Sequence, residues 1–291
     1  MNLYSSKEMT DLLERHNFFF KKNLGQNFLM NESIAARIAD ASFETVPKSG
    51  KKSLAIEIGP GAGSLTLQLA KRFDSVLALE IDPHLIGVLD ESLADESNVK
   101  VVQADALAYD FSKVLRDYPE HSIAVCSNLP YYITSEIIMR LLESALPITS
   151  ITVLIQKEAA VRLTSKPGSE QYGAITAAVG FYASSEKLFT VGPGNFIPRP
   201  KVDSAVLRLT PYGEPAVKVQ DQELFFKLIR AAFGNRRKTL SNALSSALKV
   251  CYSKEHILKM LDLAEIDPNR RGETLSLEEY AKISDAFTNS R

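Results

Sequence analysis

The sequence predicts a doubly wound α/β domain with a mostly parallel, seven-stranded sheet, followed by a small all-helical domain. Short apolar runs bounded by turn residues alternate with helical patterns through most of the chain, which is typical of strands joined by crossover helices. The first run leads into a glycine-rich turn and a helix, the opening unit of such folds. The predicted strands are 54–58, 75–79, 98–102, 123–126, 150–156, 188–191 and 202–209.

Composition limits the classes of function. The chain has 291 residues, a hydrophobic fraction of 45% and a net charge of −1, so any contact with nucleic acid has to come from local patches. Cys126 and Cys251 lie far apart without a CxxC or Cys/His cluster, so we expect free thiols and no metal site. No apolar run approaches the ~18 residues that span a bilayer, and no signal-peptide core is evident. We therefore expect a cytoplasmic protein with no membrane partner.

We expect three parts: an N-terminal extension over 1–20, an α/β domain over 21–212 and a helical domain over 216–291. The extension is an amphipathic lead-in that ends in phenylalanines. The second boundary lies at Tyr212-Gly213-Glu214-Pro215, because strand patterns stop there and glycine and proline break the chain.

The segment 21–29, Lys-Lys-Asn-Leu-Gly-Gln-Asn-Phe-Leu, places a glycine and amides after two lysines. Such a segment could fold over a polar ligand. The same residues also fit the capped start of a helix with solvated lysines, so both interpretations stay open.

Three consecutive predicted strands lead into Gly59, Glu80 and Asp105. The turn 59–64 would expose backbone amides at a helix N-terminus. Glu80 stands where these folds place an acid that accepts from both ribose hydroxyls, and Asp105 could accept from an adenine amino group. A single acid after a strand is more often a solvated loop charge. Three such strand ends in succession predict a nucleoside site.

The fourth strand runs into Asn128-Leu129-Pro130-Tyr131, at the same edge of the sheet. The exocyclic nitrogen of adenine is a poor nucleophile, because its lone pair is delocalised into the ring. The Asn128 side-chain oxygen and a backbone carbonyl of the turn could hold its two N–H groups and free that lone pair. Pro130 fixes the turn, and Tyr131 offers a face on which a flipped base can rest. An ordinary β-turn before a helix is the alternative.

The loop 192–201 contains three prolines and holds Phe196 near Arg199 and Lys201. An aromatic ring beside cations could stack a base and hold a phosphate, although a phenylalanine packed under its own loop fits equally well.

The helical tail has an uneven charge distribution. From Leu224 to Lys254 there is no acid, whereas exposed helix faces normally mix both signs. This predicts a nucleic-acid-binding face. The seven bases of this stretch are Lys227, Arg230, Arg236, Arg237, Lys238, Lys249 and Lys254.

Together these motifs resemble the KsgA-type ribosomal RNA adenine dimethyltransferase family. The resemblance runs from about Lys21 to about Leu277. It implies a Rossmann-like class I methyltransferase domain that uses S-adenosylmethionine. It also implies N6 methylation of two adjacent adenosines near the 3′ end of small-subunit rRNA. We expect a monomer that meets this rRNA within an assembling 30S particle, although the sequence leaves naked RNA open as the substrate. The motifs that carry it are LGQNFL (24–29), EIGPGAG (57–63), NLPY (128–131), QKE (156–158), PRPKVDS (198–204), RAAF (230–233) and RRKTL (236–240).

The resemblance also implies residue roles. Tyr131 and Phe196 would sandwich the flipped adenine, while Asn128 would serve both the cofactor and the target amine. The residues Arg236, Arg237 and Lys238 would contact RNA. The implied cofactor contacts are Asn27, Leu29, Gly59, Glu80, Asp105 and Asn128.

Two departures from the family pattern stand out. Cys126-Ser127 replaces a small apolar pair, from which we expect an effect on packing only. Ser241 stands where a base is common, which puts one phosphate contact in doubt. Two alternatives are a resistance-type adenine methyltransferase acting on large-subunit rRNA and a non-catalytic relative such as a mitochondrial transcription factor. The helical tail disfavours the first, and the intact NLPY motif disfavours the second.

Overall fold

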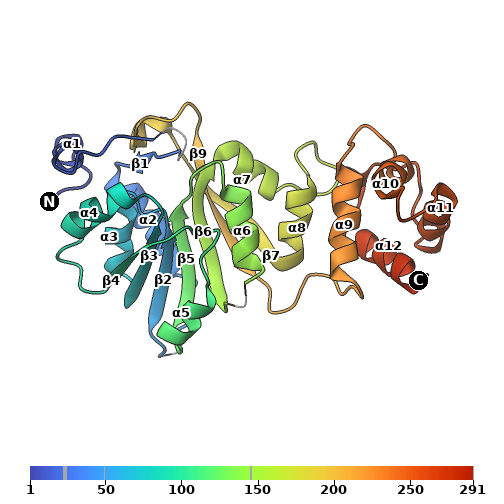
Figure 1. Cartoon of the computed structure of the whole chain (residues 1–291), viewed down its shortest axis with the longest axis horizontal. Helices are drawn as coiled ribbons and strands as arrows, with labels where there is room; N and C mark the ends of the chain where they lie inside the picture. Colours follow the sequence, from blue (N-terminus) through green and yellow to red (C-terminus); the bar gives the residue numbers. More distant parts are fainter. Residues whose placement is uncertain (22–24, 49, 145, 291) are drawn as a thin grey trace. The chain divides into compact units, whose positions relative to one another are not determined.

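The computed structural model describes residues 1–21, 25–48, 50–144 and 146–290, which form two compact units. Unit 1 comprises Met1–Ala160 with Ser185–Pro211, and unit 2 comprises Val161–Ser184 with Tyr212–Arg291. Figure 1 labels the elements. The helices are α1 (Ser6–Arg15), α2 (Glu32–Phe43), α3 (Ser64–Ala70), α4 (Pro83–Ser92), α5 (Ser112–Asp117), α6 (Thr134–Leu142), α7 (Lys157–Leu163), α8 (Ala174–Tyr182), α9 (Gln222–Phe233), α10 (Leu240–Leu248), α11 (Lys254–Leu263) and α12 (Leu277–Asn289).

The predicted seven-stranded, mostly parallel sheet is confirmed. Its strand order is β4-β3-β2-β5-β6-β9-β7. The five strands from β4 to β6 run parallel, whereas β9 pairs with β6 in the antiparallel sense. A separate two-stranded ribbon pairs β1 with β8. The strands are β1 (Phe28–Leu29), β2 (Ser53–Ile58), β3 (Ser75–Glu80), β4 (Val99–Gln103), β5 (Ser122–Asn128), β6 (Ile148–Gln156), β7 (Ala183–Val191), β8 (Phe196–Ile197) and β9 (Ser204–Pro211).

The strand order reverses between β2 and β5, as Figure 1 shows. From β2 the chain builds outward through β3 to β4, and from β5 it builds in the other direction. In open α/β sheets such a switch point opens a crevice at the carboxyl ends of the strands. Of the residues predicted to form the site, Gly59, Glu80, Asp105 and Asn128 lie at or just after those carboxyl ends.

The first twenty residues belong to unit 1 and form part of its core. Ser5 caps α1 by accepting from the Glu8 N–H, and Met9 and Leu12 are fully buried. They pack in one cluster with Phe28 before α2 and with Leu85 of α4. The structure therefore groups the expected N-terminal extension with the α/β sheet.

Unit 2 contains one helix that the sequence assigned to the α/β domain. The Phe181 ring of α8 lies 5.2 Å from the Phe225 ring of α9, and both are buried in one cluster with residues of α10, α11 and α12. The expected boundary near residue 212 therefore misses Val161–Ser184, which the structure places in the helical unit.

Glu57 is a carboxyl group buried inside unit 1. It lies on β2, its side chain is 1% exposed, and its Oε2 atom has no hydrogen-bond partner among the described residues. Burial, aided by the nearby Glu80 carboxyl, raises the pKa of Glu57 to about 8. At neutral pH the group therefore keeps its proton, which avoids the cost of an uncompensated buried charge.

This raised pKa predicts a pH-dependent stability. The folded state binds the Glu57 proton more tightly than the unfolded chain does. The stabilisation that this proton gives to the folded state is therefore complete below about pH 4.5 and is lost as the pH rises to about 8. The melting temperature of the wild type should fall relative to that of Glu57→Gln between pH 5 and pH 8, because glutamine cannot ionise. Scanning calorimetry of both proteins across this range measures the difference. Parallel curves would contradict a buried, protonated Glu57.

Candidate functional site

The glycine turn after β2 requires its glycines. Gly61 has a φ of 63°, and an added Cβ would lie 2.9 Å from the Phe28 ring. Gly59 has a φ of 70° and lies against Pro130, since an added Cβ would meet the proline ring at 3.8 Å. The turn can therefore approach both the segment before α2 and the Asn128–Tyr131 turn without intervening side chains.

Glu80, at the end of β3, lies beside this turn with its side chain held by backbone groups. Its Oε2 accepts from the Gly61 N–H at 3.3 Å and its Oε1 from the Asp82 N–H at 2.8 Å. Burial raises the pKa of Glu80, and these N–H groups oppose the shift. The result is a carboxyl group whose direction is fixed.

One cavity of about 220 Å³ collects the predicted cofactor residues. Its acidic lining residues are Glu57, which keeps its proton at neutral pH, Glu80 and the exposed Asp105, and no base lines it among the residues that the structure describes. Such a lining suits a cationic nucleoside with free hydroxyls and disfavours a pyrophosphate. The six predicted residues that line the cavity are Asn27, Leu29, Gly59, Glu80, Asp105 and Asn128.

Asn128 ends β5 with its amide oriented by the segment before α2. Its Nδ2 donates to the Asn27 carbonyl at 2.8 Å, which leaves Oδ1 available as an acceptor at the cavity. In the adjoining turn, the Pro130 carbonyl already accepts from the Thr134 hydroxyl at 3.1 Å. Among the described residues, the Leu129 carbonyl of the same turn accepts no hydrogen bond.

Ser127 does more than the packing expected of it. Its Oγ accepts from the Ile58 N–H at 2.9 Å in a fully buried position. The backbone pairing of β2 with β5 ends at Ile56 and Val125, so this hydrogen bond joins the strands two residues beyond that pairing. It fixes the glycine turn relative to Asn128. Cys126, in contrast, is buried and contributes to the apolar cluster, as expected.

Tyr131 and Phe196, the two rings predicted to stack on the flipped adenine, differ in their exposure to the cavity. Tyr131 lines the cavity, and its hydroxyl lies 3.0 Å from the Ser204 Oγ. Phe196 is 4% exposed and does not line the cavity, because its pairing with Leu29 in the β8–β1 ribbon turns it into the apolar cluster. In this structure the Phe196 ring presents no exposed face, and its stacking on the flipped adenine stays a prediction.

The predicted RNA-binding residues lie in the loop between α9 and α10 of unit 2, and all three are exposed. Arg236 is bound within the unit: its Nε lies 3.1 Å from Glu273 and its Nη2 donates to the Glu170 carbonyl at 2.8 Å. Within the described parts of the chain, the side chains of Arg237 and Lys238 form no ion pair. The three bases are therefore not equivalent.

A second loop, before α12, adjoins the first. The Leu240 N–H donates to the Arg270 carbonyl at 2.6 Å and the Ser241 N–H to the Pro268 carbonyl at 3.1 Å, so this loop caps α10. Ser241 is 6% exposed, and its side chain faces inward rather than toward a phosphate.

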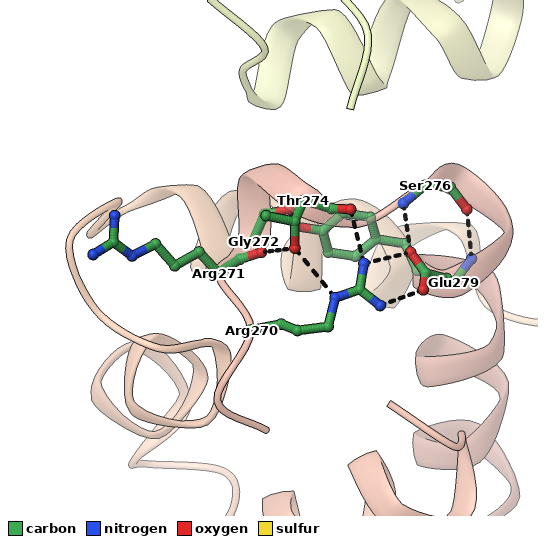
Figure 2. Close-up of polar contacts among 7 residues, drawn as sticks. Arg270, Arg271, Gly272, Thr274, Ser276 and Glu279 are labelled. Carbon is green, nitrogen blue, oxygen red and sulfur yellow. Dashed lines mark hydrogen bonds and ion pairs between the residues drawn. The ribbon is translucent and has the colours of Figure 1, made fainter. Parts of the chain in front are cut away.

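Figure 2 shows that the neighbouring residues Arg270 and Arg271 point in different directions. Arg270 turns inward, where it pairs with Glu279 and donates to the Thr274 carbonyl at 2.8 Å. Arg271 extends away from these contacts and is exposed. Sequence reasoning missed Arg271, because it lies outside the acid-free stretch.

A sequence model of the family described as ribosomal RNA adenine dimethylase matches residues 17–288. The chain belongs to the ribosomal RNA adenine dimethylase family. It is 44% identical over 283 residues to the ribosomal RNA small subunit methyltransferase A of Alkaliphilus metalliredigens, which covers 97% of this chain and 96% of that protein.

Two solved structures share the architecture. A dimethyladenosine transferase from Plasmodium falciparum superposes with a TM-score of 0.74 at 24% identity, covering 90% of this chain and 98% of that one, and supports the fold alone. The 23S rRNA methyltransferase ErmE superposes with a TM-score of 0.65 at 27% identity, covering 90% and 99%. Among the described residues, no helix of this dimethylase-family chain is long and apolar enough to cross a membrane.

S-adenosylmethionine, the methyl donor expected from the sequence, fits the cavity chemically. The molecule carries positive charge and a ribose diol but no phosphate, which agrees with an acidic lining free of described bases. The fixed Glu80 carboxyl can accept from hydroxyls, and Gly59 and Gly61 place backbone without side chains on the cavity wall.

Proposed function

We propose that this dimethylase-family chain transfers methyl groups from S-adenosylmethionine to N6 of two adjacent adenosines near the 3′ end of small-subunit (16S) rRNA. The observation that carries the proposal is the oriented Asn128 amide, which offers an acceptor oxygen on the wall of an acidic nucleoside-sized cavity. The relatives named for small-subunit rRNA support this substrate over large-subunit rRNA.

The residues of the turn would activate the amine without a strong base. Asn128 Oδ1 and the Leu129 carbonyl would each accept one N–H of the adenine amine, which draws the nitrogen toward tetrahedral geometry and frees its lone pair. The Thr134 hydroxyl holds the Pro130 carbonyl, and this contact keeps the turn rigid. Tyr131 would support the base from the cavity side.

The cofactor would be held by residues from three strand ends and from the segment before α2. When bound, S-adenosylmethionine supplies an electrophilic methyl group. Glu80 would accept from its ribose hydroxyls and Asp105 from its adenine amino group. Gly59 would lie along the methionine part, while Asn27 and Leu29 would close the wall above it.

Unit 1 would carry the chemistry, and unit 2 would hold the RNA. The bases Arg237, Lys238 and Arg271 lie on adjoining loops of unit 2 and are exposed. Arg236 would act on RNA only indirectly, by fixing the loop through Glu273. Phosphate contacts of this kind position the enzyme, whereas the cavity selects the base.

The setting that we propose is the cytoplasm, with a monomer acting on an assembling 30S particle. Cys251 is an exposed thiol and Cys126 a buried one, and both are free, which suits a reducing compartment.

Asn128→Ala should keep the fold and lose most turnover. Alanine supplies no acceptor for the amine, and loss of one positioned group of this kind costs about 10²–10³ in rate. Single-turnover methylation of small-subunit rRNA particles measures the loss, with circular dichroism to verify folding. Asn242→Ala, an exposed change in unit 2, is the matched control. Near-normal methylation by folded Asn128→Ala would contradict activation by the turn.

The double variant Arg237→Ala/Lys238→Ala should flatten the salt dependence of RNA binding by about two units, because each phosphate contact contributes close to one. Affinity for S-adenosylmethionine should not change. Filter binding of small-subunit rRNA particles across a salt series, together with calorimetry of the cofactor, separates the two effects.

Arg236→Ala provides the control for that experiment. Since Arg236 is held by Glu273 and the Glu170 carbonyl, its loss should lower the melting temperature of the protein. Its direct effect on the salt slope should be smaller than that of either neighbour. If Arg236→Ala flattens the slope as much as each neighbour does, the structural role assigned to Arg236 is wrong.

A further inference from the structure

Asp82 lies between β3 and α4, outside both the Asn128–Tyr131 turn and the RNA-binding loops. Its side chain is fully buried and meets three donors from two parts of the chain. Oδ1 accepts from Lys21 Nζ at 2.9 Å and from the His84 N–H at 3.1 Å. Oδ2 accepts from Gln26 Nε2 at 3.0 Å.

The charge of Asp82 is compensated by these donors. Burial alone would raise the pKa of Asp82, but hydrogen bonds from Lys21, the His84 N–H and Gln26 outweigh it and lower the pKa. The carboxylate is therefore ionised at neutral pH. A buried ionised group with all its contacts made is rigid, because moving any donor away would expose an uncompensated charge.

Capping of α4 explains only one of these contacts. Asp82 is the N-cap residue of α4, and this role needs one oxygen and the His84 N–H. Lys21 and Gln26 contribute nothing to that helix. They belong to the segment before α2, where the Lys21 N–H also donates to Gln26 Oε1 at 2.8 Å.

The same segment forms one wall of the cavity, from Gly25 to Leu29. Asn128 holds this wall at the Asn27 carbonyl, beside β5. Asp82 holds it at Gln26, beside the end of β3. The wall is thus fastened on both sides of the point where the strand order reverses.

Asp82 also acts on Glu80 through its backbone. The Asp82 N–H donates to Glu80 Oε1 at 2.8 Å, so one residue sets both the direction of the Glu80 carboxyl and the position of Gln26. A ligand between Glu80 and Gln26 therefore meets two side chains at a fixed separation, because the Asp82 N–H holds one and the Asp82 carboxylate holds the other.

We propose that Asp82 is a positioning residue for cofactor binding, which fixes the wall Gly25–Leu29 relative to Glu80 through its contacts with Lys21 and Gln26. This inference rests on the proposed S-adenosylmethionine site. Asp82 sets the shape of that site before binding, so it governs affinity for the cofactor and not the methyl-transfer step.

The test compares Lys21→Met and Gln26→Met with Lys100→Met, a control lysine that pairs with Asp117 at 3.5 Å at an exposed site. Each test variant should raise the dissociation constant for S-adenosylmethionine about threefold to tenfold, as expected for one lost hydrogen bond to a charged group. The melting temperature should fall below that of the control, because the buried Asp82 carboxylate loses a donor, so binding is measured at a temperature where circular dichroism shows each variant folded. At saturating cofactor, kcat should remain within about twofold of the wild type while KM for the cofactor rises, a split that a general loss of structure would not give.

Two further variants make the outcome decisive. In Asp82→Asn, the side-chain oxygen can still cap α4 and accept from Lys21, because both contacts use Oδ1, but the NH₂ group would face the donor Gln26. The negative charge that Lys21 meets is lost as well, so the dissociation constant should rise more than in Gln26→Met. Adding Gln26→Met to Asp82→Asn should cause little further loss, because both changes break the contact between residues 26 and 82.

Glu80→Ala separates failure of this inference from failure of the site itself. If Glu80→Ala weakens cofactor binding while Lys21→Met and Gln26→Met bind like the control, Asp82 is only a helix cap and the proposed function stands. If Glu80→Ala also binds like the wild type, the proposed cofactor site is wrong and the inference falls with it.

Discussion

The candidate site depends on the neighbouring positions of β2 and β5, where the strand order of the sheet reverses. Their parallel pairing brings the glycine turn after β2 and the Asn-Leu-Pro-Tyr turn after β5 to one edge, where Gly59 lies against Pro130. The Ser127 hydroxyl extends this pairing by holding the Ile58 N–H. A side chain larger than hydrogen at Gly61 would collide with the Phe28 ring, so the geometry tolerates little change.

A second constraint comes from the chain that crosses this edge. The segment Gly25–Leu29 is fixed by Asp82 on one side, by Asn128 on the other and by strand pairing of Leu29 with Phe196. The hydrogen bond that anchors the segment also orients the Asn128 amide. The hydrogen bond from Asn128 to the Asn27 carbonyl therefore holds both the cavity wall and the acceptor oxygen, so a change in the position of one alters the position of the other.

Much of this arrangement could be predicted from the sequence, because parallel strands bring their carboxyl ends to one edge whatever their exact lengths. This is why Gly59, Glu80, Asp105 and Asn128 line one cavity. Long-range pairing could not be predicted in the same way. The burial of Phe196 follows from a two-residue ribbon between the predicted loop 192–201 and the segment 21–29, for which the sequence predicts either a cover over a ligand or the start of a helix.

The charges of the helical unit show the same limit. The acid-free stretch predicts an exposed basic surface, but composition cannot reveal that Arg236 meets Glu273, which lies far along the chain. The central claim is the reaction itself, and mass spectrometry of rRNA tests it most directly. Purified protein should be incubated with S-adenosylmethionine and small-subunit particles from a strain that lacks the enzyme. The account predicts N6,N6-dimethyladenosine at two adjacent positions near the 3′ end of small-subunit rRNA; methylation of large-subunit rRNA, or of neither, would contradict it.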